Sequence, residues 1–578
     1  MNSRFSRFET IAYLLAFLLA FGLRFARLGA PALTDSEATV ALQALHLAQG
    51  LRPALSPNVA YVNLTAILFF IFGSTNFLAR FWPALVGSAL PLVPWLFRGR
   101  IKPRPAIFLA FFLAVDPALV AISRTAGGSI FVVAGLLFAW GFWERKQPRL
   151  AGIFSALALL GGSVLWAGLL GLLITWLITQ GIFARPKVEP AEPTTEDSAS
   201  ESEFPPQKTN RWALTEDHRS FFISLLATLF VVSTLFLLAP QGLSAWLGSP
   251  VAYLRGWFSP GTAPASRLLL ALAAYEPLAI VLAMIALVRG WINGSQRVIR
   301  LSLWMLVALL LALFYPQRQP VDLVWPLIPL WAMASLELAR HARLVRDDRL
   351  ETVGVILFTI LLLGFAWLDF IALYWLPIPS KEADLRLALL LGSVVLFIVS
   401  IVLVGYGWSG RVARIGAAWG VLFIFGIYTL GSAWGATGLR MANSVELYRT
   451  DVPIGQAQLL VQTADQMSDW SVGQADQLPV TIFGVDSPAL LWALRFHNPQ
   501  VVTALDPTSS PAMVITPPQQ NLQLAAAYRG QDFSWRQTPS WDVFSAYSLR
   551  WLTLRELPSQ PENIVLWVRN DLFKDAQK

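Results

Sequence analysis

The chain has 578 residues, of which 56% are hydrophobic and 13% charged, with a mean hydropathy of +0.56 and a formal net charge of +8. Soluble domains are about 25% charged, so water is not the main solvent of this chain. The absence of cysteine excludes disulfides, thiol nucleophiles and cysteine metal sites, and the four histidines lie too far apart for a paired metal site.

Long apolar runs recur through the first 435 residues, and each matches a helix that crosses a hydrocarbon core of about 30 Å. The first run follows Arg4 and Arg7, which predicts a cytoplasmic N-terminus. An odd number of crossings then places the C-terminus outside. The thirteen predicted spans are 10–28, 78–97, 105–122, 128–143, 149–164, 166–183, 219–239, 267–289, 300–315, 322–338, 352–371, 386–405 and 413–433.

One further apolar run, 61–73, is predicted not to span. If it crossed, the basic cluster from Arg98 to Arg104 would lie outside; if it rests on the outer face, that cluster and the later ones fall inside. The basic residues therefore indicate topology, and we predict a lipid bilayer and no nucleic acid as the partner of this charge.

Two segments break the membrane pattern. Residues 185–212 are rich in proline and acidic residues, which predicts a disordered cytoplasmic linker. From 436 the chain turns polar, with predicted strands at 478–483, 501–505 and 512–516 and a helix at 488–496. We therefore predict an all-α polytopic membrane domain, 1–435, and a small extracytoplasmic α/β domain, 436–578.

The first outer loop, within 29–77, carries two acids, Asp35 and Glu37, just before an amphipathic helix at 39–49. Thr34 or Asp35 is suited to cap that helix, with acid in its first turn. A carboxylate held at the membrane surface is also suited to act as a general base on a hydroxyl nucleophile. The sequence leaves both roles open.

Several arginines lie on the same predicted outer face. Arg124 follows the third span and Arg318 lies in a proline-rich turn, while Arg80, Arg255 and Arg267 have weaker context. An arginine at a helix end can reach the headgroups, or its planar guanidinium can hold a lipid phosphate. Arg124 and Arg318 are the candidate phosphate-binding residues.

Together these features resemble the membrane glycosyltransferases of the GT-C superfamily, nearest to the protein mannosyltransferase and aminoarabinose transferase type. The features are the anchor helix, the acidic first loop, the stretch from Phe70 to Arg80, the Ser123-Arg124 turn, the proline-rich tenth span, and an outer α/β domain. Segments 458–463 and 487–495 resemble a prokaryotic subgroup linked with N-glycosylation gene clusters.

The resemblance implies an inverting transfer of a sugar from a polyprenyl-phosphate carrier to a glycan, lipid or protein acceptor on the outer face. It implies no nucleotide-sugar donor, and we predict no cofactor, although the sequence does not decide whether a divalent metal takes part. Asp35 and Glu37 are the candidate catalytic residues, and Arg124, Arg318, Arg80 and Tyr61 the candidate substrate-binding residues.

The acidic motif differs from the family pattern in two places. Ser36 occupies the position of the usual aspartate, and Gly127, Gly128 and Ser129 stand where many members carry a second acid. Two hypotheses follow. Either Asp35 is the base and Glu37 orients, or the chain is a non-catalytic relative that binds or helps flip a lipid-linked sugar.

Overall fold

The computed structural model describes residues 7–182, 216–261, 263–341, 349–376, 380–440, 444–449, 451–518 and 522–573. The predicted linker, 185–212, lies outside the described residues. Helices up to Ala436 are α1 (Arg7–Phe25), α2 (Asp35–Ala48), α3 (Val59–Phe72), α4 (Asn76–Ser88), α5 (Val93–Leu96), α6 (Arg98–Ile101), α7 (Pro103–Val115), α8 (Pro117–Ser123), α9 (Ser129–Glu144), α10 (Pro148–Leu159), α11 (Val164–Ile182), α12 (Glu216–Thr234), α13 (Gln241–Gly256), α14 (Ala265–Tyr275), α15 (Pro277–Ile292), α16 (Gln296–Phe314), α17 (Val324–His341), α18 (Arg349–Tyr374), α19 (Lys381–Val404) and α20 (Gly410–Ala436).

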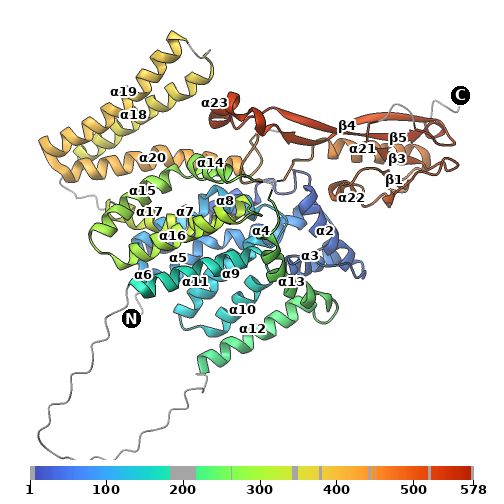
Figure 1. Ribbon diagram of the computed structural model, residues 1–578, viewed down its shortest axis with the longest axis horizontal. Helices are drawn as coiled ribbons and strands as arrows, with labels where there is room; N and C mark the ends of the chain where they lie inside the picture. Colours follow the sequence, from blue (N-terminus) through green and yellow to red (C-terminus); the bar gives the residue numbers. More distant parts are fainter. Residues whose placement is uncertain are drawn as a thin grey trace, which may run out of the picture.

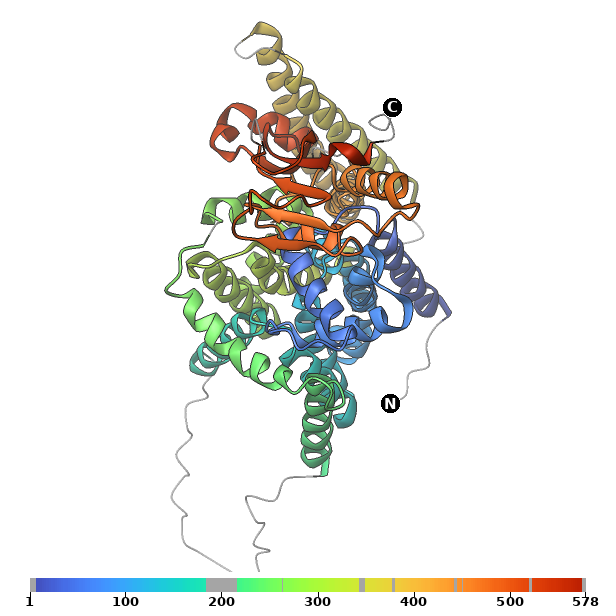
Figure 2. The same cartoon turned by 90° about the vertical axis from the view of Figure 1, so that its right-hand side faces the viewer.

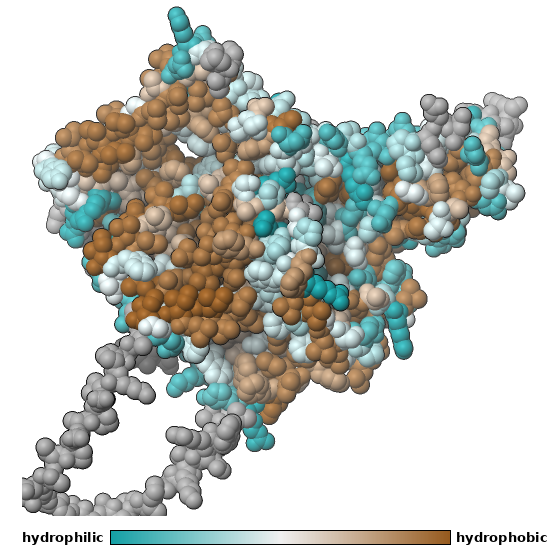
Figure 3. Space-filling model, viewed as in Figure 1, coloured by the Kyte–Doolittle hydropathy of each residue, from teal (hydrophilic) through white to brown (hydrophobic). Residues whose placement is uncertain are grey.

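These helices form a bundle with the C-terminal sheet at one end (Figure 1). Within the described ranges, seven helical segments are long and apolar enough to cross a membrane, or up to nine if each of two bent pairs is one span. Apolar side chains cover much of the bundle surface and polar ones gather on the sheet (Figure 3). The predicted helical membrane architecture is confirmed, while the count of thirteen spans stays a prediction, because α9 and α10 are shorter than a full span.

Two predicted spans are bent rather than straight. The run 105–122 is divided into α7 and α8 by a bend of 54° at Asp116-Pro117, and the run 267–289 into α14 and α15 by a bend of 89° at Glu276-Pro277. Proline has no N–H to donate, and its ring clashes with the preceding turn, so each helix ends before its proline and restarts at it. A hydropathy pattern alone does not register this break.

The run predicted to rest on the outer face forms α3, a helix of 14 residues. At 1.5 Å per residue its length is about 21 Å, which is shorter than a hydrocarbon core of about 30 Å. One flank packs into the core, whereas Phe70, Ile71 and Phe72 at its end are exposed. This length suits a helix that dips into one face of the membrane, and its place on the outer face stays a prediction.

The C-terminal region contains a five-stranded sheet in the order β2-β1-β3-β5-β4. Strand β1 pairs in parallel with β2 and β3, and β5 pairs antiparallel with β3 and β4. The elements are α21 (Ala457–Val472), β1 (Val480–Phe483), α22 (Pro488–Ala493), β2 (Gln500–Val502), β3 (Met513–Thr516), β4 (Tyr528–Pro539), α23 (Phe544–Leu554) and β5 (Ser559–Arg569). Short helical turns are η1 (Leu90–Leu92), η2 (Pro320–Leu323), η3 (Gly405–Ser409), η4 (Trp541–Val543) and η5 (Asn570–Leu572).

The three predicted strands and the predicted helix correspond to β1, β2, β3 and α22. The two longest strands, β4 and β5, have no counterpart in the sequence prediction. Most of β4 is solvent-exposed or half-buried, so it lacks the alternation of apolar and polar residues that identifies a strand.

The sheet region packs directly on the first loop, beside α2 and α3 (Figure 2). The Trp492 indole N–H donates to the Asn76 side chain (2.8 Å), and its ring lies 5.6 Å from that of Phe69. Arg495 donates from Nε to the Ser74 hydroxyl (2.9 Å) and from Nη2 to the Ser74 carbonyl (2.8 Å). The C-terminal region is thereby fixed over the acidic loop.

Candidate active site

Asp35 joins the first loop to the sheet region. Its Oδ1 accepts hydrogen bonds from the Ser487 hydroxyl (2.5 Å) and the Ala489 N–H (3.0 Å) at the N-terminus of α22, and Oδ2 accepts from Arg536 Nε (2.8 Å). A carboxylate at a helix N-terminus is favoured by the exposed N–H groups there. Because both oxygens are engaged, these contacts favour an anchoring role for Asp35 over the predicted role as base.

Glu37 is buried and paired with a buried cation. Arg80 donates to both carboxylate oxygens, from Nε to Oε1 (2.7 Å) and from Nη2 to Oε2 (2.6 Å), and the Ala126 N–H donates to Oε1 (2.9 Å). Thr34, one of the two residues predicted as the cap, is the N-cap of α2 and forms a capping box with Glu37. Burial alone would raise the pKa of the Glu37 carboxyl, but Arg80 and these N–H groups outweigh it and hold the pKa below its usual value.

Arg80 and Tyr61 brace the loop around this pair. Arg80 also donates to the carbonyls of Pro31 (2.8 Å) and Ala32 (3.0 Å), and the Tyr61 hydroxyl donates to the carbonyl of Ala79 (2.9 Å). Tyr61 is fully buried. These contacts hold the loop in place, and neither side chain is among those that line the two cavities described below.

The two predicted phosphate-binding arginines are engaged with backbone. Arg124 donates to the carbonyls of Leu23, Arg24 and Thr437, so it ties the ends of α1, α8 and α20 together. Arg318 donates to the carbonyl of Tyr315 (3.1 Å) and, at 3.3 Å, to that of Ala263. Neither arginine is among the residues that line the two cavities beside the first loop, which are described below.

A different acid lies beside the first loop. Asp451 Oδ2 accepts a hydrogen bond from the Thr34 hydroxyl (2.8 Å) and another from the Ser36 hydroxyl. Within the part of the chain that the structure describes, no cation pairs with this carboxylate. Asp451 thus lies against Ser36, the position at which the resemblance noted in the sequence implies an aspartate.

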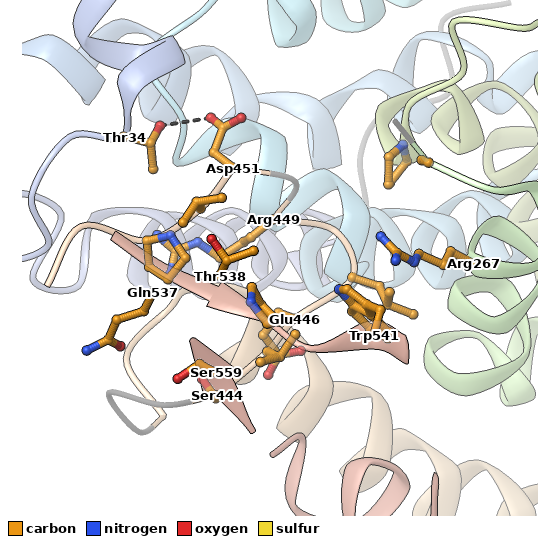
Figure 4. Close-up of a pocket in the computed structure, with 17 residues that line it drawn as sticks. Thr34, Arg267, Ser444, Glu446, Arg449, Asp451, Gln537, Thr538, Trp541 and Ser559 are labelled. Atoms are coloured by element: carbon orange, nitrogen blue, oxygen red, sulfur yellow. Dashed lines mark hydrogen bonds between the residues drawn. The ribbon is translucent and has the colours of Figure 1, made fainter. Parts of the chain in front are cut away.

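Asp451 lines two neighbouring cavities. One, of about 320 Å³, lies between the bundle and the sheet and is also lined by Arg267, Glu446 and Trp541 (Figure 4). The other, of about 240 Å³, lies between the first loop and the start of α9. Thr34, Arg449 and Asp451 line both, so these residues form the boundary between the two spaces.

Arg449 is the cation at this boundary. Within the described residues its guanidinium takes part in no recorded hydrogen bond or ion pair. Burial lowers the pKa of Arg449, with a further contribution from the positive charge of Arg80, while Glu37, Glu446 and Asp451 act in the opposite direction. A partly desolvated guanidinium without a partner is suited to an anionic ligand.

The smaller cavity also faces the N-terminus of α9. Its lining includes Thr125, Gly127, Gly128 and Ser129, and no side chain caps the helix at Gly128. A Cβ at Gly128 would overlap the Gly161 carbonyl, whereas one at Gly127 would meet nothing within 4 Å. Uncapped N–H groups and the helix dipole favour an anion such as a phosphate at this point.

The larger cavity presents a surface of a different kind. Arg267 lies over the ring of Trp541 with its guanidinium carbon 4.5 Å from the ring centroid. Figure 4 shows this pair on the far side of the cavity from Thr34 and Asp451. An aromatic face next to carboxylate and guanidinium groups can pack against the C–H face of a sugar and hydrogen-bond to its hydroxyls.

The sequence analysis did not identify Asp451 and Arg449, because both lie in the short segment 444–451 that follows the last predicted span. The sequence carries one indication of a site in this segment. Three charged residues follow shortly after an apolar helix, namely Glu446, Arg449 and Asp451. Across the ranges that the structure describes, no group of three His, Asp or Glu side chains is placed to hold a metal ion.

Comparison with known proteins gives matches of structure. No family model matches the chain, and no curated protein matches it in sequence. The crystal structure of ArnT from Cupriavidus metallidurans bound to undecaprenyl phosphate covers 97% of this chain and 98% of its own, with 14% identity and a TM-score of 0.51. The archaeal oligosaccharyltransferase AglB from Archaeoglobus fulgidus, in complex with an inhibitory peptide and a dolichol-phosphate, covers 85% of this chain and 64% of its own, with 12% identity and a TM-score of 0.43.

Proposed function

We propose that this chain, whose fold is that of the GT-C membrane glycosyltransferases, transfers a sugar from a polyprenyl-phosphate carrier to an acceptor hydroxyl or amide on the outer face of the membrane. The observation that carries the proposal is that a cation and a carboxylate lie at the boundary of two adjoining cavities. The cation is Arg449, whose guanidinium has no hydrogen-bond or ion-pair partner among the described residues, and the carboxylate is Asp451, which two hydroxyls hold. The undecaprenyl phosphate bound by ArnT makes a lipid phosphate the donor class we favour.

In this proposal the donor phosphate occupies the smaller cavity. Arg449 and the N-terminus of α9 would stabilise its negative charge, and Gly127 leaves room for its oxygens. As the bond between the anomeric carbon and the phosphate oxygen breaks, the phosphate leaves with the electron pair and stays on the lipid. Arg449 and the N–H groups of α9 would therefore stabilise the transition state most, because the negative charge on the phosphate increases there.

The acceptor enters from the larger cavity. Asp451 takes the proton of the acceptor hydroxyl or amide as its oxygen or nitrogen bonds to the anomeric carbon, from the side opposite the leaving phosphate, which inverts the configuration. Asp451 is preferred to Asp35 as the base because Asp451 lines both cavities, while both oxygens of Asp35 are committed to α22 and Arg536. Glu37 positions Ala126 and Arg80 and takes no proton.

Purified full-length protein in proteoliposomes, given a panel of polyprenyl-phosphate sugars and simple acceptors, tests the proposal. We expect release of polyprenyl phosphate and glycosylation of the acceptor with at least one donor. Saturable donor binding with no release across the panel would instead support a binding or flipping role.

A further inference from the structure

A third cavity, polar and of about 1120 Å³, lies among helix ends of the bundle, away from the acidic first loop. These ends belong to α1, α6, α7, α15, α16, α17 and α20, of which α6, α15 and α17 lie on the side of the bundle away from the sheet (Figure 1). Seven of the lining side chains are basic, namely Lys102, Arg104, Arg289, Arg297, Arg340, Arg411 and Arg414. The inward bias of basic residues explains why this end of the bundle is positive, but it does not explain why side chains from seven helices line one cavity.

Among the described residues, few carboxylates compensate the positive charge of this basic cavity. Among its described lining residues the one carboxylate is Glu9, which pairs with Arg98 (3.3 Å), and Arg289 pairs with Glu337 from the bundle interior. Arg340 and Arg414 both lie close enough to repel Arg289 electrostatically. Because the cations repel one another, a bound anion would lower the energy of the arrangement.

An apolar groove adjoins the basic cavity. It has a volume of about 570 Å³ and is lined by Met284, Ile285, Val288 and Ile292 on α15, together with Arg289 and Asn293. About half or more of each of these four apolar side chains is exposed. Arg289 lines both the groove and the basic cavity. The positively charged cavity and the apolar groove therefore meet at this residue.

We propose that this pair of spaces binds an anionic phospholipid, with its phosphate in the basic cavity and an acyl chain along the α15 groove. A free phosphate would use the cations and leave the groove empty, whereas a zwitterionic lipid would carry its own positive charge into a positive space. Basic pockets between membrane helices are suited to anionic headgroups. This inference does not depend on the proposed transferase activity.

The test uses the delipidated full-length protein in detergent, with phosphatidylglycerol, phosphatidylcholine and glycerol phosphate as separate probes. Native mass spectrometry counts bound lipid, and a titration gives the Kd. We expect one phosphatidylglycerol to bind and to raise the Tm, with much weaker binding of the other two probes. Glycerol phosphate binding as tightly as phosphatidylglycerol would overturn the proposal, because the groove would then contribute nothing.

Two sets of variants separate a defined site from diffuse surface charge. Arg297→Gln with Arg340→Gln removes two cavity cations, and Arg149→Gln with Arg219→Gln removes two exposed cations of α10 and α12 that do not line it. We expect the first pair to weaken phosphatidylglycerol binding by about tenfold or more and the second by less than about twofold. Equal losses would overturn the proposal.

Val288→Trp tests the groove independently, because the larger side chain fills the groove without changing the charge. We expect weaker phosphatidylglycerol binding with the same Tm in the absence of lipid. Unchanged affinity in this variant would contradict the assignment of the acyl chain to α15.

Discussion

The hydroxyl of Ser36 donates a hydrogen bond to the carboxylate of Asp451, which lies 415 residues further along the chain. The resemblance noted in the sequence implies an aspartate at the position of this serine, and the carboxylate of Asp451 comes from the segment that follows α20. The acidic group of the first loop is thus supplied by a residue from the far end of the chain. This relationship is the basis for choosing Asp451 as the base.

Gly127→Val is expected to block the donor without disturbing the fold. A side chain at Gly127 meets no protein atom within 4 Å and would project into the smaller cavity. Donor affinity, measured by titration with a polyprenyl-phosphate sugar, should fall by about tenfold or more, the loss of about 1.4 kcal/mol of binding. Gly248→Val on α13 is the matched control, because its added side chain also meets nothing within 4 Å.

Arg449→Gln should weaken donor binding and slow transfer together, since the guanidinium contacts the phosphate in both the ground state and the transition state. A hydrogen bond between charged groups contributes about 1.5 to 3 kcal/mol, so we expect a loss of about ten- to hundredfold in kcat/KM. Arg449→Lys should recover part of it by retaining the charge. Equal kcat/KM in wild type and Arg449→Gln would remove Arg449 from the site.

Asp35→Asn is expected to loosen the sheet region rather than abolish the chemistry. Asp35 and Arg536 are partly exposed and separated by 2.8 Å, and such an ion pair contributes about 1 kcal/mol or less. A double-mutant cycle with Arg536→Gln should show non-additive losses in Tm, with transfer retained. Complete loss of turnover in Asp35→Asn at unchanged Tm would instead favour Asp35 as the base.

Glu37→Gln should destabilise the protein strongly, because it leaves the buried guanidinium of Arg80 without its counter-ion. Removing one partner of a buried pair costs about 3 to 5 kcal/mol. The pKa of Glu37 is lowered in the folded protein, so its contribution is present above the usual pKa of about 4.3 and is lost as the pH falls through the folded pKa. The difference in Tm between wild type and Glu37→Gln should therefore narrow at acid pH.

The features of the fold that depend on a short stretch of residues could be predicted from the sequence. Hydropathy identified the helical bundle, and Thr34 was one of the two residues predicted as the cap of α2. The charges that follow the apolar run at 61–73 separate it from the spans, and this assignment stays a prediction. The bends at Asp116-Pro117 and Glu276-Pro277 were missed, although proline was there to indicate them.

The site could be predicted only in part, because its components are joined by tertiary contacts. Asp35 and Glu37 were identified as acids of the first loop, but their partners, Arg536 and Arg80, could not be inferred from spacing. Asp451 reaches the same loop only through the packing of the C-terminal region on α2. No local pattern encodes that contact.

The most direct test of the proposed base compares sugar transfer by the wild type and by Asp451→Asn, with Asp35→Asn as a second variant. All three are assayed at equal amounts of folded protein, with a donor that the wild type uses. Asparagine retains an acceptor oxygen for Thr34 and Ser36 but cannot take a proton. The account predicts a fall in kcat of at least about a hundredfold for Asp451→Asn, within the range for loss of a general base, with donor affinity unchanged. Full turnover by Asp451→Asn would contradict it.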